Sequence, residues 1–82
     1  MKDHKYFVYI ICNPGKTVLY TGVTQDLGIR LQQHYENRGK RSTFAGRYYC
    51  YKLLYYEVSN DIIQAIQREK EIKLWTRAKK KR

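Results

Sequence analysis

The sequence contains few cysteines, few acidic residues and no long apolar run, and each shortage excludes a class of protein. Its two cysteines, Cys12 and Cys50, lie far apart and form no CxxC pair or Cys/His cluster, so neither a zinc site nor a disulfide framework is predicted. The longest apolar run, residues 6–12, ends at Asn13 and is too short to span a membrane or to act as a secretory signal. We therefore expect a cytoplasmic protein with reduced thiols and no membrane partner.

The shortage of acidic residues leaves a strongly basic chain. It has 7 Asp and Glu residues against 17 Lys and Arg residues, which gives a formal net charge of +10 over 82 residues. Such a charge favours polyanions, and nucleic acid first among them, although a basic chain can instead be merely soluble or bind acidic membranes or ribosomal RNA. At this length we expect one domain, residues 1–82, with a core over about residues 6–75 and a basic tail at residues 77–82.

Two runs rich in β-branched and aromatic residues, 6–12 and 17–23, predict a β-hairpin. The residues between them include Pro14 and Gly15, a pair that suits the central positions of a type II turn. If that turn closes between its neighbours, the register places Tyr9 directly opposite Tyr20 on one face of the sheet. We expect the chemistry of the protein at this pair.

Helices and a third strand follow the hairpin. Thr24 as N-cap, with Asp26 in the first turn, predicts a helix from about residue 25 to residue 35 or 36. A third strand is expected over residues 48–58, apolar on both faces as though covered on each side or buried at one edge. A last helix is expected from about Asp61 to at least Trp75. The elements together predict an α+β fold.

The two predicted helices each carry candidate site residues. Arg30 and His34 lie at spacing i, i+4 on the first helix, pointing at the rim of the sheet. On the last helix, a projection at 100° per residue places Glu69 inside the apolar stripe and Glu71 on the opposite face. A carboxylate in an apolar stripe needs a partner. Glu69 is therefore a candidate metal ligand, with a structural ion pair to Arg30 or Lys73 as an equal alternative.

A phosphodiesterase needs the side chains that these elements supply. A carboxylate holds a divalent cation, an arginine binds the scissile phosphate, and a phenol positions or deprotonates the attacking water. Because tyrosine has a pKa near 10, a nearby cation must favour its phenolate. The candidate set is Tyr9, Tyr20, Arg30, His34 and Glu69. The alternative is that the two tyrosines are ordinary aromatic strand residues.

The polar segment 37–47 supplies cations that could contact a nucleic-acid backbone, either from a loop or from a short irregular helix. A solvated loop is the equal alternative. The candidate nucleic-acid contacts are Arg38, Lys40, Arg41 and Arg47, with Lys73 on the last helix.

Four short motifs occur in a characteristic order. They are Val8-Tyr9-Ile10, Tyr20-Thr21-Gly22, Asp26-Leu27-x-x-Arg30-x-x-x-His34 and Arg68-Glu69-x-x-Ile72-Lys73-x-Trp75. Over about residues 6–75 this order resembles the GIY-YIG endonuclease family, and most closely its small standalone members, whose domain also forms the N-terminal incision module of the excision-repair nuclease. The resemblance implies a three-stranded antiparallel sheet flanked by helices.

The same resemblance implies hydrolysis of DNA, structured or damaged DNA included, with one Mg²⁺ or Mn²⁺ ion. It assigns Tyr9 as the likelier general base beside Tyr20, Arg30 to the phosphate and Glu69 to the metal, with His34 hydrogen-bonded in the same site. We expect a monomeric endonuclease with little intrinsic sequence specificity. Some members carry a lysine where Val23 stands, so a non-catalytic nucleic-acid-binding module on the same scaffold is the alternative.

Overall fold

A computed structural model describes the backbone of residues 5–80 and the side chains of residues 5–74. The elements are β1 (Tyr6–Cys12), β2 (Leu19–Thr24), α1 (Leu27–Glu36), α2 (Phe44–Arg47), β3 (Lys52–Ser59) and α3 (Ile62–Lys80). The strands form one antiparallel sheet in the order β2-β1-β3, so the predicted α+β class with a three-stranded antiparallel sheet is confirmed. The side chains of the expected basic tail, residues 77–82, lie outside the described part.

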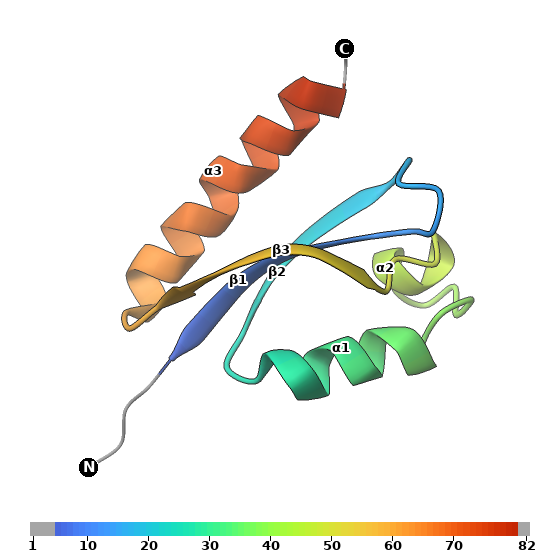
Figure 1. Cartoon of the computed structure of the whole chain (residues 1–82), viewed down its shortest axis with the longest axis horizontal. Coiled ribbons are helices and arrows are strands. Elements are labelled where there is room, and N and C mark those ends of the chain that lie inside the picture. The colour runs from blue at the N-terminus through green and yellow to red at the C-terminus, as the bar shows by residue number, and fades with distance from the viewer. Residues whose placement is uncertain (1–4, 81–82) are drawn as a thin grey trace.

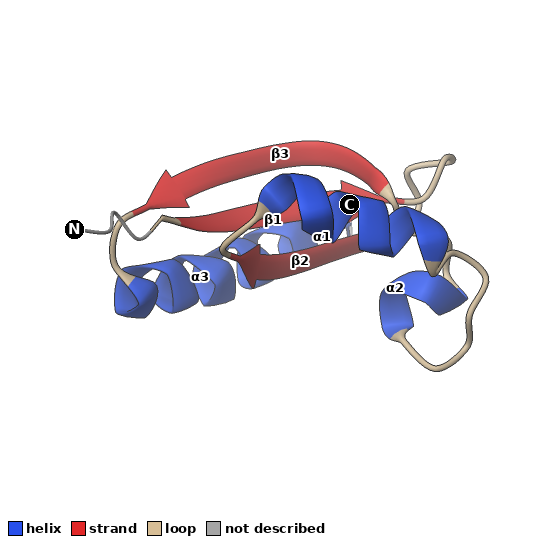
Figure 2. Cartoon of the chain, turned by 90° about the horizontal axis from the view of Figure 1, so that it is seen from below, coloured by secondary structure: helices blue, strands red, loops and turns tan. Residues whose placement is uncertain are grey.

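The sheet separates two groups of helices (Figures 1 and 2), with α3 along one face and α1 and α2 along the other. Because side chains alternate along a strand, the central strand β1 contributes to both faces. Val8 and Ile10 pack toward α3, and Tyr9 and Ile11 pack toward α1 and α2. No helix within residues 5–80 has the length and apolar character needed to cross a membrane.

The hairpin turn is longer than the sequence predicts. The Asn13 carbonyl accepts the N–H of Lys16 at 2.9 Å, but the Asn13 N–H then donates to the Val18 carbonyl at 3.3 Å. The Asn13 side-chain oxygen also accepts the N–H groups of Thr17 and Val18, at 2.9 and 3.0 Å. The positive φ falls at Lys16 (58°) and not at Gly15, so the predicted type II turn is wrong.

This longer turn shifts the register by two residues. Tyr9 lies opposite Gly22 and Tyr20 lies opposite Ile11, so the prediction that the two tyrosines are direct cross-strand partners is wrong. A shift by an even number of residues keeps both side chains on the same face. The two phenols are therefore diagonal neighbours on the face that carries α1 and α2.

The N-cap of α1 lies later than predicted. Asp26 caps the helix, since its side chain accepts the N–H of Ile29 at 3.0 Å, and the Thr24 hydroxyl accepts the N–H of Asp26 at 3.2 Å. The predicted Thr24 cap is therefore wrong. At the start of α3, the Ser59 hydroxyl likewise accepts the N–H of Asp61 at 3.2 Å, so both helices begin after the same hydroxyl-x-Asp pattern.

The third strand differs from the prediction in its start and its burial. β3 begins at Lys52, because the chain after α2 still bonds back to it, with the Cys50 N–H donating to the Ala45 carbonyl at 2.8 Å. β3 is also an edge strand. The expected burial on both faces is wrong: the strand exposes large side chains, namely Leu53, Leu54, Tyr55, Tyr56 and Val58.

Candidate active site

The two tyrosines of the sheet meet over a glycine. Tyr9 is buried, and its ring centroid lies 6.5 Å from that of Tyr20. A Cβ atom at Gly22, the cross-strand partner of Tyr9, would lie 2.6 Å from the Tyr9 hydroxyl oxygen and 3.2 Å from Cε2 of Tyr20. The ring of Tyr9 therefore occupies the space that a side chain at position 22 would need.

α1 adds a histidine to this pair. Nε2 of His34 lies 2.9 Å from the Tyr9 hydroxyl oxygen, and the His34 ring centroid lies 5.8 Å from that of Tyr9 and 5.6 Å from that of Tyr20. The predicted hydrogen bond of His34 within the site is present. Three rings from β1, β2 and α1 thus form one cluster.

Burial keeps both hydrogen-bonded partners neutral. It raises the pKa of Tyr9 to about 12, with the neighbouring Tyr20 phenol adding to the effect and Arg30 opposing it. Burial, and then the charge of Arg30, lower the pKa of His34 below its ordinary value. At neutral pH His34 is therefore an uncharged imidazole. In its Nδ1–H tautomer, its Nε2 accepts a hydrogen bond from the Tyr9 hydroxyl.

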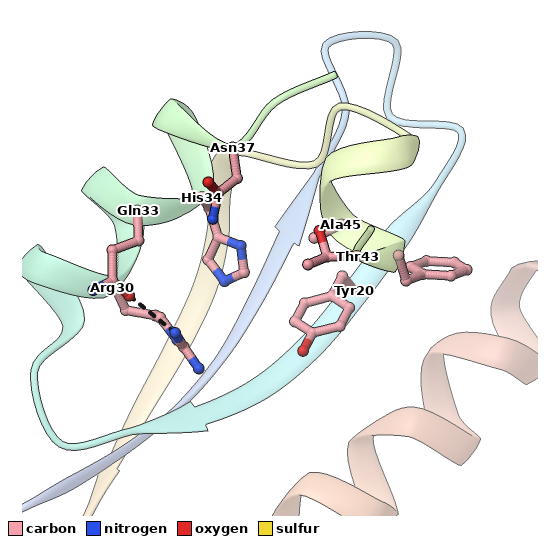
Figure 3. A pocket seen from close by; sticks show the side chains of 8 residues that line it. Tyr20, Arg30, Gln33, His34, Asn37, Thr43 and Ala45 are labelled. Carbon is pink, nitrogen blue, oxygen red and sulfur yellow. Dashed lines mark hydrogen bonds between the residues drawn. The ribbon is translucent and has the colours of Figure 1, made fainter. Parts of the chain in front are cut away.

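Arg30 lies one turn before His34 on the wall of an open cavity of about 210 Å³ (Figure 3). Its guanidinium donates to the side-chain oxygen of Gln33 at 2.9 Å, which orients it. The cavity lies between α1, α2 and β2, and its lining residues are Tyr20, Arg30, Gln33, His34, Asn37, Thr43, Phe44 and Ala45. An anion in this cavity would meet Arg30 directly.

Glu69 of α3, the predicted metal ligand, is partly buried and paired with a lysine. Its side chain is 19% exposed and accepts an ion pair from Lys73 at 3.0 Å, so one of the two predicted ion pairs is present. The charge of Glu69 adds a minor contribution to the raised pKa of Tyr9, after burial and the Tyr20 phenol. Glu71 is 66% exposed and pairs with Arg68 at 3.1 Å, on the opposite face of the helix as predicted.

The side chains of the site can hold a divalent ion only if the substrate supplies further ligands. Among the described residues, no three His, Cys, Asp or Glu side chains come close enough to hold a metal together. Mg²⁺ keeps most of its waters and binds proteins through one or two carboxylates together with substrate phosphates. The partly buried Glu69 suits that role, so the residues present fit a divalent ion that is held jointly with a substrate phosphate.

The predicted basic contacts fall into two places. Arg47, the last residue of α2, donates to the carbonyl of Arg41 at 3.3 Å. Arg38, in the segment between α1 and α2, places its guanidinium carbon 3.7 Å from the centre of the Tyr35 ring. Lys40 and Arg41 are exposed in the same segment. No ion pair with a carboxylate involves these four cations within the described part of the chain. Lys73 lies apart from them on α3.

Part of the cavity wall is formed by residues that the sequence analysis does not single out. Phe44 is 51% exposed, and its ring lies 6.3 Å from that of Tyr20 at an interplanar angle of 27°. A lone aromatic residue inside a polar, basic segment was the signal that could have indicated it. Gln33, Asn37 and Thr43 were missed as well, because single polar residues in helices and loops carry no periodic pattern.

Comparisons with known proteins identify the family of the chain. The family model of the GIY-YIG catalytic domain matches residues 5–82. A UPF0213 protein of Staphylococcus epidermidis is 39% identical over 77 residues, covering 93% of this chain and 89% of the relative. A UPF0213 protein of Staphylococcus aureus is 38% identical over 78 residues, covering 94% and 90%. No solved structure matches the chain. The chain therefore belongs to the GIY-YIG family of nuclease domains, as its motifs predicted.

Proposed function

We propose that this protein is a divalent-metal-dependent endonuclease that hydrolyses phosphodiester bonds in DNA with little sequence specificity. The observation that carries the proposal is the buried Tyr9 phenol held 2.9 Å from His34, beside a cavity that Arg30 lines. A buried, neutral acid–base pair next to an arginine-lined opening is the arrangement that activation of water beside a phosphate requires.

The proton path follows from the two pKa shifts. With its pKa raised to about 12, Tyr9 alone is a poor base at neutral pH. As the phenol takes a proton from the attacking water, neutral His34 accepts the phenolic proton at Nε2, so no free phenolate has to form first. Arg30 binds the phosphate oxygens and stabilises the negative charge that develops on them.

Glu69 would hold the metal ion, for which one Mg²⁺ or Mn²⁺ is proposed. When bound, such an ion supplies charge neutralisation at the leaving oxygen. Tyr20 closes the site from β2 and keeps the Tyr9 ring in place across Gly22. Lys73 lies beside the same carboxylate and would contact the phosphate that shares the ion.

One observation favours the alternative of a non-catalytic nucleic-acid-binding module. Glu69 already pairs with Lys73, so its carboxylate could have a structural role only. An i, i+4 ion pair on a helix contributes about 0.3–0.5 kcal/mol. This stabilisation is small compared with the free-energy cost of placing a carboxylate in an apolar stripe. The ion pair alone therefore explains Glu69 poorly, and the enzymatic proposal ranks first.

A plasmid-nicking assay with Mg²⁺ or Mn²⁺ tests the proposal. We expect Tyr9→Phe to lower nicking by at least about 100-fold, the usual effect of removing one acid–base group. Glu69→Gln should also lower nicking, because it removes the proposed metal ligand. Glu71→Gln is the matched control, because it neutralises an exposed glutamate on the opposite face of α3 and should nick as the wild type does. Unchanged nicking in the first two variants would disprove the enzymatic proposal.

Binding measurements separate the two roles of the site. In an anisotropy titration Glu69→Ala should retain DNA affinity, whereas Arg30→Ala should lose affinity as well as activity. If Glu69 acts only through Lys73, then Glu69→Gln and Lys73→Gln will lower the melting temperature equally, and the wild type will bind DNA without nicking it. That result would support the non-catalytic alternative.

A further inference from the structure

The cavity has an aromatic wall that phosphodiester hydrolysis does not need. Phe44 is half-exposed and lies nearly parallel to Tyr20, with ring centroids 6.3 Å apart. The ring of Tyr48 also lies beside that of Phe44, with ring centroids 4.9 Å apart. An exposed aromatic ring that neighbouring rings hold in one orientation is a surface on which a planar group can stack at low entropic cost.

Three further lining residues of the cavity are polar and uncharged. Gln33 and Asn37 project from the α1 side and Thr43 from the α2 side (Figure 3). Gln33 uses its carbonyl oxygen for Arg30, and its NH₂ group still provides donors. An apolar face with amides and a hydroxyl at its margin matches a nucleobase, which has a flat π surface and hydrogen-bonding edges.

The size and position of the cavity limit the class of ligand that it can hold. Its volume of about 210 Å³ is below the range of about 300–1,000 Å³ for drug-sized ligands, so it suits one ring system and not a longer ligand. Arg30 and His34 form part of the same wall. A base in the cavity would therefore belong to a nucleotide next to the phosphate that Arg30 binds.

Bases inside a duplex are paired and stacked, so they cannot enter such a cavity without leaving the helix. We infer that the cavity holds the base of an unpaired nucleotide beside the scissile phosphate, and that the preferred substrate is DNA with a single-stranded segment, such as a flap or an overhang. This inference rests on the proposed nuclease function and specifies its substrate class. Lys40 and Arg41, exposed in the segment that joins Asn37 to Thr43, would follow the backbone of that strand.

Metal-free binding to three fluorescent probes tests the inference: a single strand, a flap and a continuous duplex of equal length. The Tyr9→Phe protein is used so that no DNA is cut. Adding Phe44→Ala should weaken binding to the single strand and the flap by about 5- to 150-fold, the range for loss of one base–aromatic stack. Duplex binding should change less than about twofold, since phosphate contacts dominate it.

Matched variants keep the result interpretable. Phe44→Trp preserves a stacking surface and should bind single strands as the parent does, whereas Phe44→Leu preserves apolar packing and should not. Tyr55→Ala removes an aromatic side chain of similar exposure, 42%, from an edge strand where its cross-strand partner Ile10 faces α3. This control should leave all three affinities unchanged.

An abasic scan gives a test that needs no variant of Phe44. A single abasic site, moved along the single strand, should weaken binding at one position only, and Phe44→Leu should cancel that effect. Equal loss on all three probes, or a flat scan, would overturn the inference. A position-dependent abasic effect without nicking would disprove the nuclease proposal alone, and nicking with a flat abasic scan would disprove this inference alone.

Discussion

At the scale of single residues, position 22 determines where the Tyr9 ring can lie. The hydroxyl oxygen and Cζ of Tyr9 would be 2.6 and 2.8 Å from any Cβ there, closer than non-bonded carbon atoms approach. Tyr9 is buried and hydrogen-bonded to His34, so the ring has little room to retreat. The glycine is needed because a phenol lies across the neighbouring strand.

Gly22→Ala should therefore damage both stability and function. We expect a loss of about 1–3 kcal/mol in the free energy of unfolding, as for other overpacked cores, and a loss of nicking because the bond between Tyr9 and His34 lengthens. Gly28→Ala is the control: its Cβ would meet no atom closer than Asp26 Oδ1 at 3.7 Å, and it should stabilise the protein by about 0.4–1 kcal/mol. Chemical denaturation and the nicking assay report both effects, and a Gly22→Ala protein with normal stability would show that the ring can relocate.

The buried pair should also make stability depend on pH at both ends of the range. His34 has a lowered pKa in the folded protein, so protonation favours the unfolded chain and stability falls as the pH drops below about 6.5. Tyr9 has a raised pKa of about 12, so its contribution is complete below about pH 10 and is lost as the pH rises to about 12.

Melting temperatures measured across this pH range check both limbs. His34→Gln should flatten the acid limb and Tyr9→Phe should flatten the alkaline limb, because each variant removes the titrating group. Limbs that persist in the matching variants would assign the pH dependence to other groups.

At the scale of elements, α3 depends on two buried contacts to hold Glu69 near the sheet. Ala65 and Ile72 are buried against Val8 and Ile10, and Glu69 lies between them in sequence. Ile72→Ala should cost about 2–5 kcal/mol in unfolding free energy, a large part of the stability of so small a protein. Leu74→Ala, at a side chain that is 67% exposed, should change it by less than about 0.5 kcal/mol.

A second attachment joins α3 to the edge strand. Arg68 donates two bonds of 2.8 Å to the carboxylate of Glu57, which also accepts the Tyr55 hydroxyl. In a double-mutant cycle, Glu57→Gln with Arg68→Gln should lower the melting temperature no more than the larger single change, because either variant already removes the bidentate pair. Additive losses would show that the two side chains act independently.

The elements that could be predicted from sequence are those whose signal is local. β1 was predicted without error, because an apolar run ends at Asn13-Pro14. The register was missed, because it depends on side-chain bonds of Asn13 and on the positive φ of Lys16, which a turn pattern does not encode. β3 was misjudged because burial depends on strand order.

Some residues of the candidate site could likewise be predicted from the sequence, and others could not. Tyr9 and His34 were placed together by motif spacing and do lie within hydrogen-bonding distance. Phe44 and Thr43 were missed, because the four-residue helix α2 is too short to carry a periodic pattern. Their position against Tyr20 depends on how the basic segment folds back onto the sheet.

At the scale of the whole molecule, the net charge of +10 predicts affinity that falls steeply with salt. The slope of log K against log salt should be reduced by about 1 in Lys40→Ala and in Arg41→Ala, as each neutralises one phosphate. Lys52→Ala is the control, because this exposed lysine on β3 lies opposite Cys12 and does not line the cavity. Anisotropy titrations from low to high salt measure the slopes. An equal change in the control would place the DNA on a different surface.

The uneven burial of the helices has a consequence for motion. β1 is hydrogen-bonded on both sides, whereas no residue of α1 is fully buried. Local opening is easiest where few apolar contacts must break. Amide hydrogen exchange should therefore be slowest at Tyr9 and much faster along α1. Local opening of α1 would move His34 and one wall of the cavity away from Tyr9 and admit a strand, while the sheet stays folded.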